Sequence, residues 1–341
     1  MEFSTRRGTT TFPGTDSIPS SIGLLDSDGD GLTDRLYTGD TGGNVWRIDM
    51  PSAVPNDSEN PWTVFKLAEL GGTTNESDLR FFNEPSIVRT FISETIQTQV
   101  KDEDGNVVKD ENGNEITINS HQEKPYDAVL IGSGDRSNPI GIDTDDSFFM
   151  LKDSYVKTQS FYSVVEPKIP TTILKSNLYD YTTDPFSQAD TTQKLETLAV
   201  AVSQKSGWFI DLNDPGEKST AEAIVINGVV YFTTFVPADL DPSVIHCEQP
   251  NGKGFLYAVD LTLGIAIYNW KEGDADAEPE RRTEVNEQFL GAPTLIVVPD
   301  DDGDPDTDDD SIGNIIVGRK IIPVGFTLQT MRTYLYISED Q

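Results

Sequence analysis

The sequence predicts an all-β protein with β-propeller architecture, and three observations support this prediction. Most apolar segments are short, rich in β-branched and aromatic residues, and bounded by Gly, Pro, Asn or Asp. Segments with the periodicity of an amphipathic helix are scarce. A short motif recurs late in blade-sized units, as expected of a chain that repeats a small sheet. The 341 residues are enough for one such domain.

Strands are predicted along the whole chain, and one segment favours a helix. The apolar residues of that segment, residues 190–205, are spaced so that they partly form a helical face. The predicted strands are residues 34–39, 44–49, 85–92, 127–133, 147–153, 207–212, 221–226, 228–235, 255–261, 293–298 and 314–322.

A repeated motif indicates the propeller. In each copy an aromatic residue, an intervening residue and an aliphatic residue precede an aspartate. The copies are residues 46–49 (WRID), 149–153 (FMLKD, with an extra lysine), 208–211 (WFID) and 257–260 (YAVD). Two copies follow an apolar strand that ends in a turn of small residues, as in propeller blades. Their intervals are irregular, which predicts loop insertions, and a β-sandwich of amphipathic strands remains the alternative.

Two insertions and a leader are predicted around the blades. Residues 98–118 contain the units KDEDGNVV and KDENGNEI, whose Asp-Gly and Asn-Gly pairs favour tight turns, so we expect a protruding β-ribbon. Residues 299–311 are expected to form a solvated acidic loop, with a second metal ion there as an open alternative. We expect residues 1–16 to be a disordered leader and residues 17–341 to be the propeller domain.

The charge balance is strongly acidic, with 58 acidic and 25 basic residues and a formal net charge of -33. This charge favours cations over nucleic acid and anionic membranes, so we expect no nucleic-acid binding. No apolar run is long enough for membrane insertion, and no signal peptide is visible. Cys247, His121 and His246 offer little material for a disulfide framework, a zinc site or histidine-based catalysis.

The strongest candidate site is residues 26–34 (DSDGDGLTD). Aspartates stand at the first, third, fifth and ninth positions, Gly31 at the sixth, and the seventh offers a backbone carbonyl, as in the front of an EF-hand loop. The twelfth position is Tyr37 instead of a bidentate glutamate, and the following residues alternate like a strand. We predict a nine-residue Ca²⁺ loop that leads into a β-hairpin; an aspartate-rich turn is the alternative. The predicted ligands are Asp26, Asp28, Asp30, Leu32 (through its carbonyl) and Asp34.

The order of these motifs resembles the C-terminal β-propeller region of the PilY-type proteins, the tip adhesins and assembly factors of bacterial type IV pili. The resemblance spans nearly the whole chain. The family normally has further strands before the calcium loop, which are missing here, so we expect a propeller that is incomplete at its N-terminus. The similar segments are residues 17–49, 126–139, 148–153, 207–218, 226–237, 254–264 and 332–337.

This resemblance implies a modified, quinoprotein-like propeller without a bound quinone. It implies export through the periplasm, by a signal outside this chain, to the pilus tip or outer envelope. Calcium held by the five predicted ligands would regulate pilus extension against retraction, and with it twitching motility and surface attachment. Minor pilins or other pilus components are the implied partners, together with a surface or host ligand.

Two other functions stay open. One is a generic extracellular adhesion domain in which calcium only stabilises loops. The other, less favoured, is a quinone-dependent dehydrogenase, which usually has a vicinal cysteine pair that Cys247 alone cannot supply. The sequence has no nucleophile elbow, metalloprotease helix or phosphate-binding glycine loop, so we predict a protein that is not an enzyme.

Overall fold

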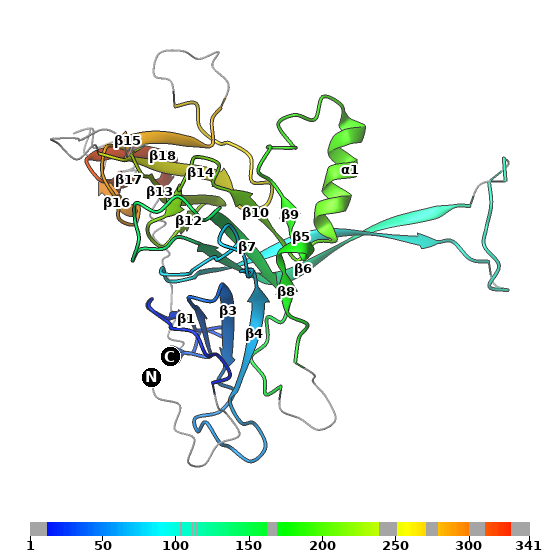
Figure 1. Cartoon of the computed structure of the whole chain (residues 1–341). Coiled ribbons are helices and arrows are strands. Elements are labelled where there is room, and N and C mark those ends of the chain that lie inside the picture. Colours follow the sequence, from blue (N-terminus) through cyan, green and yellow to red (C-terminus); the bar gives the residue numbers. More distant parts are fainter. Residues whose placement is uncertain are drawn as a thin grey trace, which may run out of the picture.

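The predicted all-β fold is confirmed by the computed structural model, in which the described residues form four sheets, one α-helix and one short 3-10 helix (Figure 1). Four parts of the chain named above lie outside the described residues: the similar segment 332–337, most of the leader, the acidic residues 300–310 and Cys247. The structure describes residues 12–102, 104–110, 112–113, 115–161, 169–238, 251–270, 279–299 and 311–328.

The first sheet begins with a hairpin that is closed by the aspartate loop. Its first four strands are antiparallel, and the fifth joins in parallel. The turn between the second and third strands is held by the buried Asp40, whose carboxylate accepts hydrogen bonds from the backbone of Gly42 and Asn44 and from the indole of Trp46. In spatial order the strands are β1 (Gly23–Leu25), β2 (Arg35–Gly39), β3 (Asn44–Asp49), β4 (Thr63–Glu69) and β8 (Ile173–Leu174).

The second sheet contains the longest strands. At its β7–β10 pair, Gly207 has a φ of 141°, and a Cβ there would lie 2.0 Å from the carbonyl oxygen of Met150. Only glycine allows the two strands to approach this closely. In spatial order the strands are β5 (Ser86–Gln99), β6 (Thr117–Gly132), β7 (Ser147–Asp153), β10 (Gly207–Asp211) and β9 (Tyr179–Asp180), and the 3-10 helix η1 (Lys175–Asn177) precedes β9.

The hairpin of β5 and β6 projects far from the body of the molecule (Figure 1). The pairing of its two strands starts at Ser86 and Leu130, well before the predicted ribbon of residues 98–118. That ribbon therefore forms only the far end of the hairpin. At that end Val108 donates to Val100, Ile116 donates to Val108, and Val100 donates to Ile116, all through backbone groups 2.8–2.9 Å apart. Two tight turns follow from this three-way junction, with Gly105 and Gly113 at φ 84° and 87°.

The single α-helix of the described residues, α1 (Thr192–Ser203), confirms the helix predicted at residues 190–205. The Thr191 hydroxyl caps it by accepting a hydrogen bond from the backbone N–H of Lys194. The helix contacts β5 beside the base of the ribbon (Figure 1). Only Val202 of its residues is buried, and no helix of the described chain is long and apolar enough to cross a membrane.

Two further sheets complete the described chain. The predicted single strand at residues 314–322 is a hairpin instead, because the chain turns at Gly318, which has a φ of 57°. The third sheet contains β11 (Lys218–Ser219), β13 (Val229–Val236), β14 (Lys253–Asp260) and β15 (Arg282–Asn286), with β12 (Ile224–Ile226) also paired to β13. The fourth contains β16 (Thr294–Pro299), β17 (Ser311–Val317) and β18 (Lys320–Leu328).

The sheets are stacked in chain order, as blades are in a propeller. Alternate residues of one strand point to opposite faces, so Phe149 packs with the first sheet and Phe148 with the third. In the same way, Tyr231 faces the fourth sheet while Phe232 faces the second. Because the inner sheets are covered on both faces, their central strands contain unbroken apolar runs, such as Phe148–Leu151 of β7. The copies of the aromatic motif lie on β3, β7, β10 and β14, and two of them therefore share the second sheet.

Candidate metal centre

The aspartate loop connects two paired strands at the edge of the first sheet. β1 ends at Leu25, β2 begins at Arg35, and these two residues are paired across the hairpin. The backbone N–H of Asp34 donates to the carbonyl of Leu25 over 2.9 Å, which closes the loop. Gly29 and Gly31 have φ angles of 82° and 86°, a conformation that other residues rarely adopt. The glycine at the sixth position thus allows the sharp turn that the sequence pattern requires.

The carboxylates of the loop accept backbone hydrogen bonds that fix their orientation. The two oxygens of Asp26 accept from the N–H groups of Gly29 and Gly31, at 2.7 and 2.8 Å. These bonds stabilise the charged form and lower the pKa of Asp26 below its ordinary value. Oδ1 of Asp28 accepts from the N–H of Asp30 at 3.2 Å. Each carboxylate oxygen has a second lone pair, so these bonds leave acceptor capacity for a cation.

Three of the four predicted aspartates converge. Carboxylate oxygens of Asp26, Asp28 and Asp34 lie within 4.8 Å of one another, and in the described part of the chain no other group of three or more acidic, histidine or cysteine side chains does so. Asp30 is not in this group; one of its oxygens accepts from the N–H of Leu32 at 2.7 Å. Three oxygens this close repel one another without a cation, whereas hard oxygen ligands with this clustering suit Ca²⁺. The donor set therefore fits calcium.

Tyr37, at the position where an EF-hand has its last ligand, lies in the core and not at the loop. Its side chain is fully buried on β2, and its hydroxyl donates to Asp153 over 2.9 Å. The loop therefore ends with Asp34, consistent with a nine-residue unit.

The loop is tied to the second sheet through two residues that sequence reasoning did not identify. Ser27 donates to Oδ2 of Asp34 from both its N–H (2.7 Å) and its hydroxyl (2.5 Å). The carbonyl of Ser27 accepts from Nη1 of Arg89 on β5, and Nε of Arg89 donates to Asp127 on β6. The alternation of polar and apolar residues along β5 does not indicate this contact, because it crosses from one sheet to another.

A buried network of charges lies beneath the loop. Arg35 and Arg47 are both fully buried; Arg35 pairs with Asp127 at 2.7 Å, and Arg47 pairs with Asp49 and Asp153 at 2.7 and 2.6 Å. Burial raises the pKa of Asp49, and the hydrogen bonds from Arg47 oppose this rise. Because Arg35 directly follows Asp34, the aspartate loop and this network are continuous in the chain.

Comparison with known proteins shows which proteins this chain is similar to. No family model matches the sequence. A curated relative, the type IV pilus biogenesis factor PilY1 homolog of Xylella fastidiosa, is 24% identical over 251 residues, which cover 72% of this chain and 14% of the relative. The crystal structure of the Pseudomonas aeruginosa PilY1 C-terminal domain matches with a TM-score of 0.50 and 16% identity, covering 89% of this chain and 59% of that one.

The chain resembles the C-terminal region of the PilY-type proteins. The resemblance that the motifs indicated is thus confirmed, and so is the propeller-like all-β fold. At 16% identity the PilY1 structure shows a shared fold alone. The chain spans 14% of the curated relative and 59% of the solved domain, so it corresponds to a part of each.

Proposed function

We propose that this chain is a calcium-binding, propeller-like module of a type IV pilus biogenesis or tip adhesin protein. In this proposal calcium occupancy regulates pilus extension against retraction and surface attachment. The observation that carries it is the convergence of Asp26, Asp28 and Asp34 on a hairpin loop of a chain that resembles the PilY-type C-terminal region. The role is one of binding and regulation, not of catalysis.

The proposed ligands extend beyond the three converged carboxylates. Ca²⁺ takes six to eight oxygen ligands in flexible geometry, so carboxylates in different orientations can share it. We propose that Asp30 and the carbonyl of Leu32 complete the protein's contribution and that water supplies the remaining oxygens. Mg²⁺ fits less well because it demands near-ideal octahedral geometry and gives up its water reluctantly.

Occupancy of the loop can affect the rest of the structure through Asp34. Without a cation, the carboxylate of Asp34 accepts its hydrogen bonds from Ser27 and is attracted by the charge of Arg89, while the neighbouring carboxylates repel it. The carbonyl of Ser27 in turn accepts a hydrogen bond from Arg89, which lies near the base of the β5–β6 hairpin that carries the ribbon. We propose that calcium steadies this contact and with it the position of the ribbon. Minor pilins or other pilus components are the proposed partners, at a pilus tip or outer envelope.

Calorimetric titration with Ca²⁺ tests the metal site directly. We expect about one ion per chain in the wild type. In Asp28→Asn the new amide oxygen keeps the hydrogen bond from the backbone of Asp30, so the turn survives while one charge and one ligand oxygen are lost. We expect affinity to fall at least tenfold in this variant.

Asp57→Asn is the matched control. Oδ1 of Asp57 also accepts two backbone hydrogen bonds in an exposed turn, from Glu59 and Asn60, but Asp57 belongs to no carboxylate cluster of the described residues. Its calcium affinity should equal that of the wild type. Unchanged binding in Asp28→Asn would move the ion to another part of the chain. Absence of binding by folded wild-type protein would end the calcium proposal.

The regulatory part of the proposal needs the full-length protein in its own bacterium. We expect the Asp28→Asn substitution to change the number of surface pili and twitching motility, whereas Asp57→Asn should change neither. Calcium binding that is lost in Asp28→Asn without any effect on pili would confine the role of the ion to stability. A pull-down of minor pilins with and without calcium would then distinguish the two roles. Binding that depends on calcium would indicate a regulated module, and binding that does not would indicate a structural one.

A further inference from the structure

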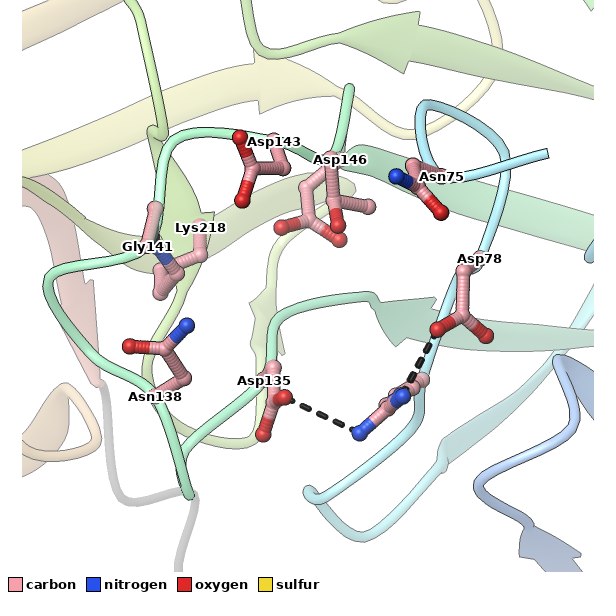
Figure 2. Close-up of a pocket in the computed structure, with 10 residues that line it drawn as sticks. Asn75, Asp78, Asp135, Asn138, Gly141, Asp143, Asp146 and Lys218 are labelled. Carbon is pink, nitrogen blue, oxygen red and sulfur yellow. Dashed lines mark hydrogen bonds and ion pairs between the residues drawn. The ribbon is translucent and has the colours of Figure 1, made fainter.

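A polar pocket of about 240 Å³ lies apart from the aspartate loop. Three segments form it: the loop after β4, the connection between β6 and β7, and the start of β11 (Figure 2). Its charged lining residues are Asp78, Arg80, Asp135, Asp143, Asp146 and Lys218.

Asp146 is a buried carboxylate with an incomplete set of hydrogen bonds. The residue is 1% exposed, and its Oδ1 accepts from the hydroxyl of Ser133 over 2.7 Å. Its Oδ2 is buried and has no hydrogen-bond partner among the described residues. Unpaired buried polar atoms are rare in native proteins because each forfeits its interaction with water. This oxygen lacks a donor, and the side chain lines the pocket (Figure 2).

The nearest cation does not supply that donor. Lys218 is 3% exposed, and its Nζ donates to the carbonyls of Pro139, Gly141 and Gly216, at 3.4, 2.8 and 2.8 Å. An ammonium group has three protons, so these three carbonyls occupy all of them. Lys218 therefore holds the connection between β6 and β7 in place and leaves Asp146 without a direct ion pair.

The pocket retains an excess of negative charge. Arg80 is engaged with Asp78 at 2.7 Å and with Asp135 at 3.1 Å, as the dashed lines in Figure 2 show. The lining includes four aspartates against one arginine and one lysine, which leaves a formal charge of about -2. Among the carboxylates that line the pocket, Asp143, exposed at the rim, and Asp146, at the floor, have no ion pair with the described residues. Such a pocket favours a cation that can donate hydrogen bonds.

We propose that this pocket binds an organic ammonium group, the head of a primary alkylamine such as a lysine side chain. Asp146, at the floor of the pocket, accepts one hydrogen bond from the ammonium group, and Asp143 supplies a second negative charge at the rim. The same loops already hold one ammonium group, that of Lys218, by three oxygen acceptors. The proposal is independent of the calcium loop and of any role in pili.

Two other classes of cation fit less well. A divalent metal favours several converging carboxylates, but in the described chain only the aspartate loop brings three of them within 4.8 Å. A guanidinium group favours a carboxylate that offers both oxygens for two parallel hydrogen bonds, whereas Oδ1 of Asp146 is already oriented by the hydroxyl of Ser133 and Oδ2 alone lacks a partner. The volume of the pocket equals that of several water molecules, at about 30 Å³ each, which suits an alkylammonium head better than a bare ion.

Calorimetric titration of the calcium-saturated chain with three probes tests the proposal. The probes are n-butylammonium, Nα-acetyl-lysine N-methylamide, and the same lysine derivative acetylated at Nε. We expect the first two to bind and the Nε-acetylated probe, which has lost its charge, to bind at least tenfold more weakly. Tighter binding of the lysine derivative would indicate a side chain from a partner protein. Equal binding of the two amines would indicate a small free amine, and both results support the pocket.

Two substitutions and a control assign the site. Asp146→Asn should lower amine affinity at least tenfold, with circular dichroism and the melting temperature showing that the fold persists. Asp143→Asn, at an exposed position, should lower it several-fold. Glu196→Gln on α1 also removes one charge, outside the pocket, and should leave affinity unchanged.

The proposal is overturned if no amine binds at millimolar concentration or if the Nε-acetylated probe binds as well as the charged one. Wild-type affinity in both Asp146→Asn and Asp143→Asn would overturn it too. Displacement of the amine by excess Ca²⁺ in Asp28→Asn, whose loop site is impaired, would reassign the pocket to a metal.

Discussion

Replacing Asp146 by asparagine should stabilise the protein at neutral pH. Burial raises the pKa of Asp146 to about 6 from an ordinary value of 3.8, and the hydrogen bond from Ser133 only partly opposes this rise. A carboxyl whose pKa is higher in the folded state binds more protons there than in the unfolded chain. The free energy of unfolding therefore falls as pH rises from 3.8 to 6, and the ionised group destabilises the fold above that range.

The size of this effect follows from the difference in pKa. A shift of about two units corresponds to about 3 kcal/mol at about pH 7.5, and to about half of that at about pH 5, where the folded protein is mostly protonated at Asp146. The asparagine side chain keeps an oxygen for Ser133 but places an NH₂ group at the unpaired position. Because this group must find an acceptor in the pocket, we expect a net gain of about 1–3 kcal/mol at neutral pH.

Urea unfolding of the wild type and Asp146→Asn at about pH 7.5 and about pH 5 measures this gain. The difference in unfolding free energy between the two proteins should shrink by about 1.5 kcal/mol at the lower pH. Asp145→Asn, at the exposed neighbouring position, should show no comparable dependence. A variant that is less stable than the wild type at neutral pH, or a difference that is the same at both values, would refute the reasoning. A stabilised variant that no longer binds amines would mark Asp146 as kept for binding at the expense of stability.

Three further outcomes are expected. A hundredfold excess of calcium over its Kd should stabilise the wild type by about 2.7 kcal/mol in thermal unfolding, and the same calcium concentration should stabilise Asp28→Asn by about 1.4 kcal/mol at most, because its affinity is at least tenfold lower; equal shifts would contradict the loop assignment. Arg47→Met should cost about 3–5 kcal/mol in urea because it leaves two buried carboxylates unpaired, whereas Lys194→Met at an exposed pair on α1 should cost less than about 0.5 kcal/mol. Gly207→Ala should cost at least about 2 kcal/mol because its Cβ would meet a carbonyl oxygen at 2.0 Å, against about 1 kcal/mol for Gly105→Ala in an open turn; similar costs for these two variants would argue against the β7–β10 geometry.

Some of the strands that the sequence predicted correctly, such as β7, lie inside the stack of sheets, and others, such as β16, lie in a sheet at its end. β7 is buried on both faces, so its residues Phe148 to Leu151 form a continuous apolar run, the pattern typical of a strand covered on both sides. β4 was not predicted, because Lys66 and Glu69 interrupt its apolar pattern. β8 has two residues and joins β4 from far along the chain, a pairing that tertiary packing alone determines.

For the candidate site too, the sequence predicted the local structure and did not predict the contacts between sheets. The aspartate loop is a local structure, so the spacing of Asp26, Asp28 and Asp34 was sufficient to predict that they converge. Contacts between sheets left no such signal: Ser27 and Arg89 are 62 residues apart, and their bond depends on how the first two sheets pack. The ammonium pocket could not be predicted for this reason. Its floor and its lysine come from different sheets.

The three-way junction at the end of the ribbon has a consequence for protein engineering. Val100, Val108 and Ile116 close the junction through backbone hydrogen bonds, and the first of the two turns is also held by the carboxylate of Asp102, which accepts from the N–H groups of Asp104 and Asn106. Each turn is a short exposed segment, the kind of position that tolerates inserted sequence. A peptide grafted between Asp104 and Gly105 would be displayed on a stalk well away from the stacked sheets (Figure 1). The molecule thus offers a ready-made site for an epitope or a fluorescent label that leaves both candidate binding sites untouched.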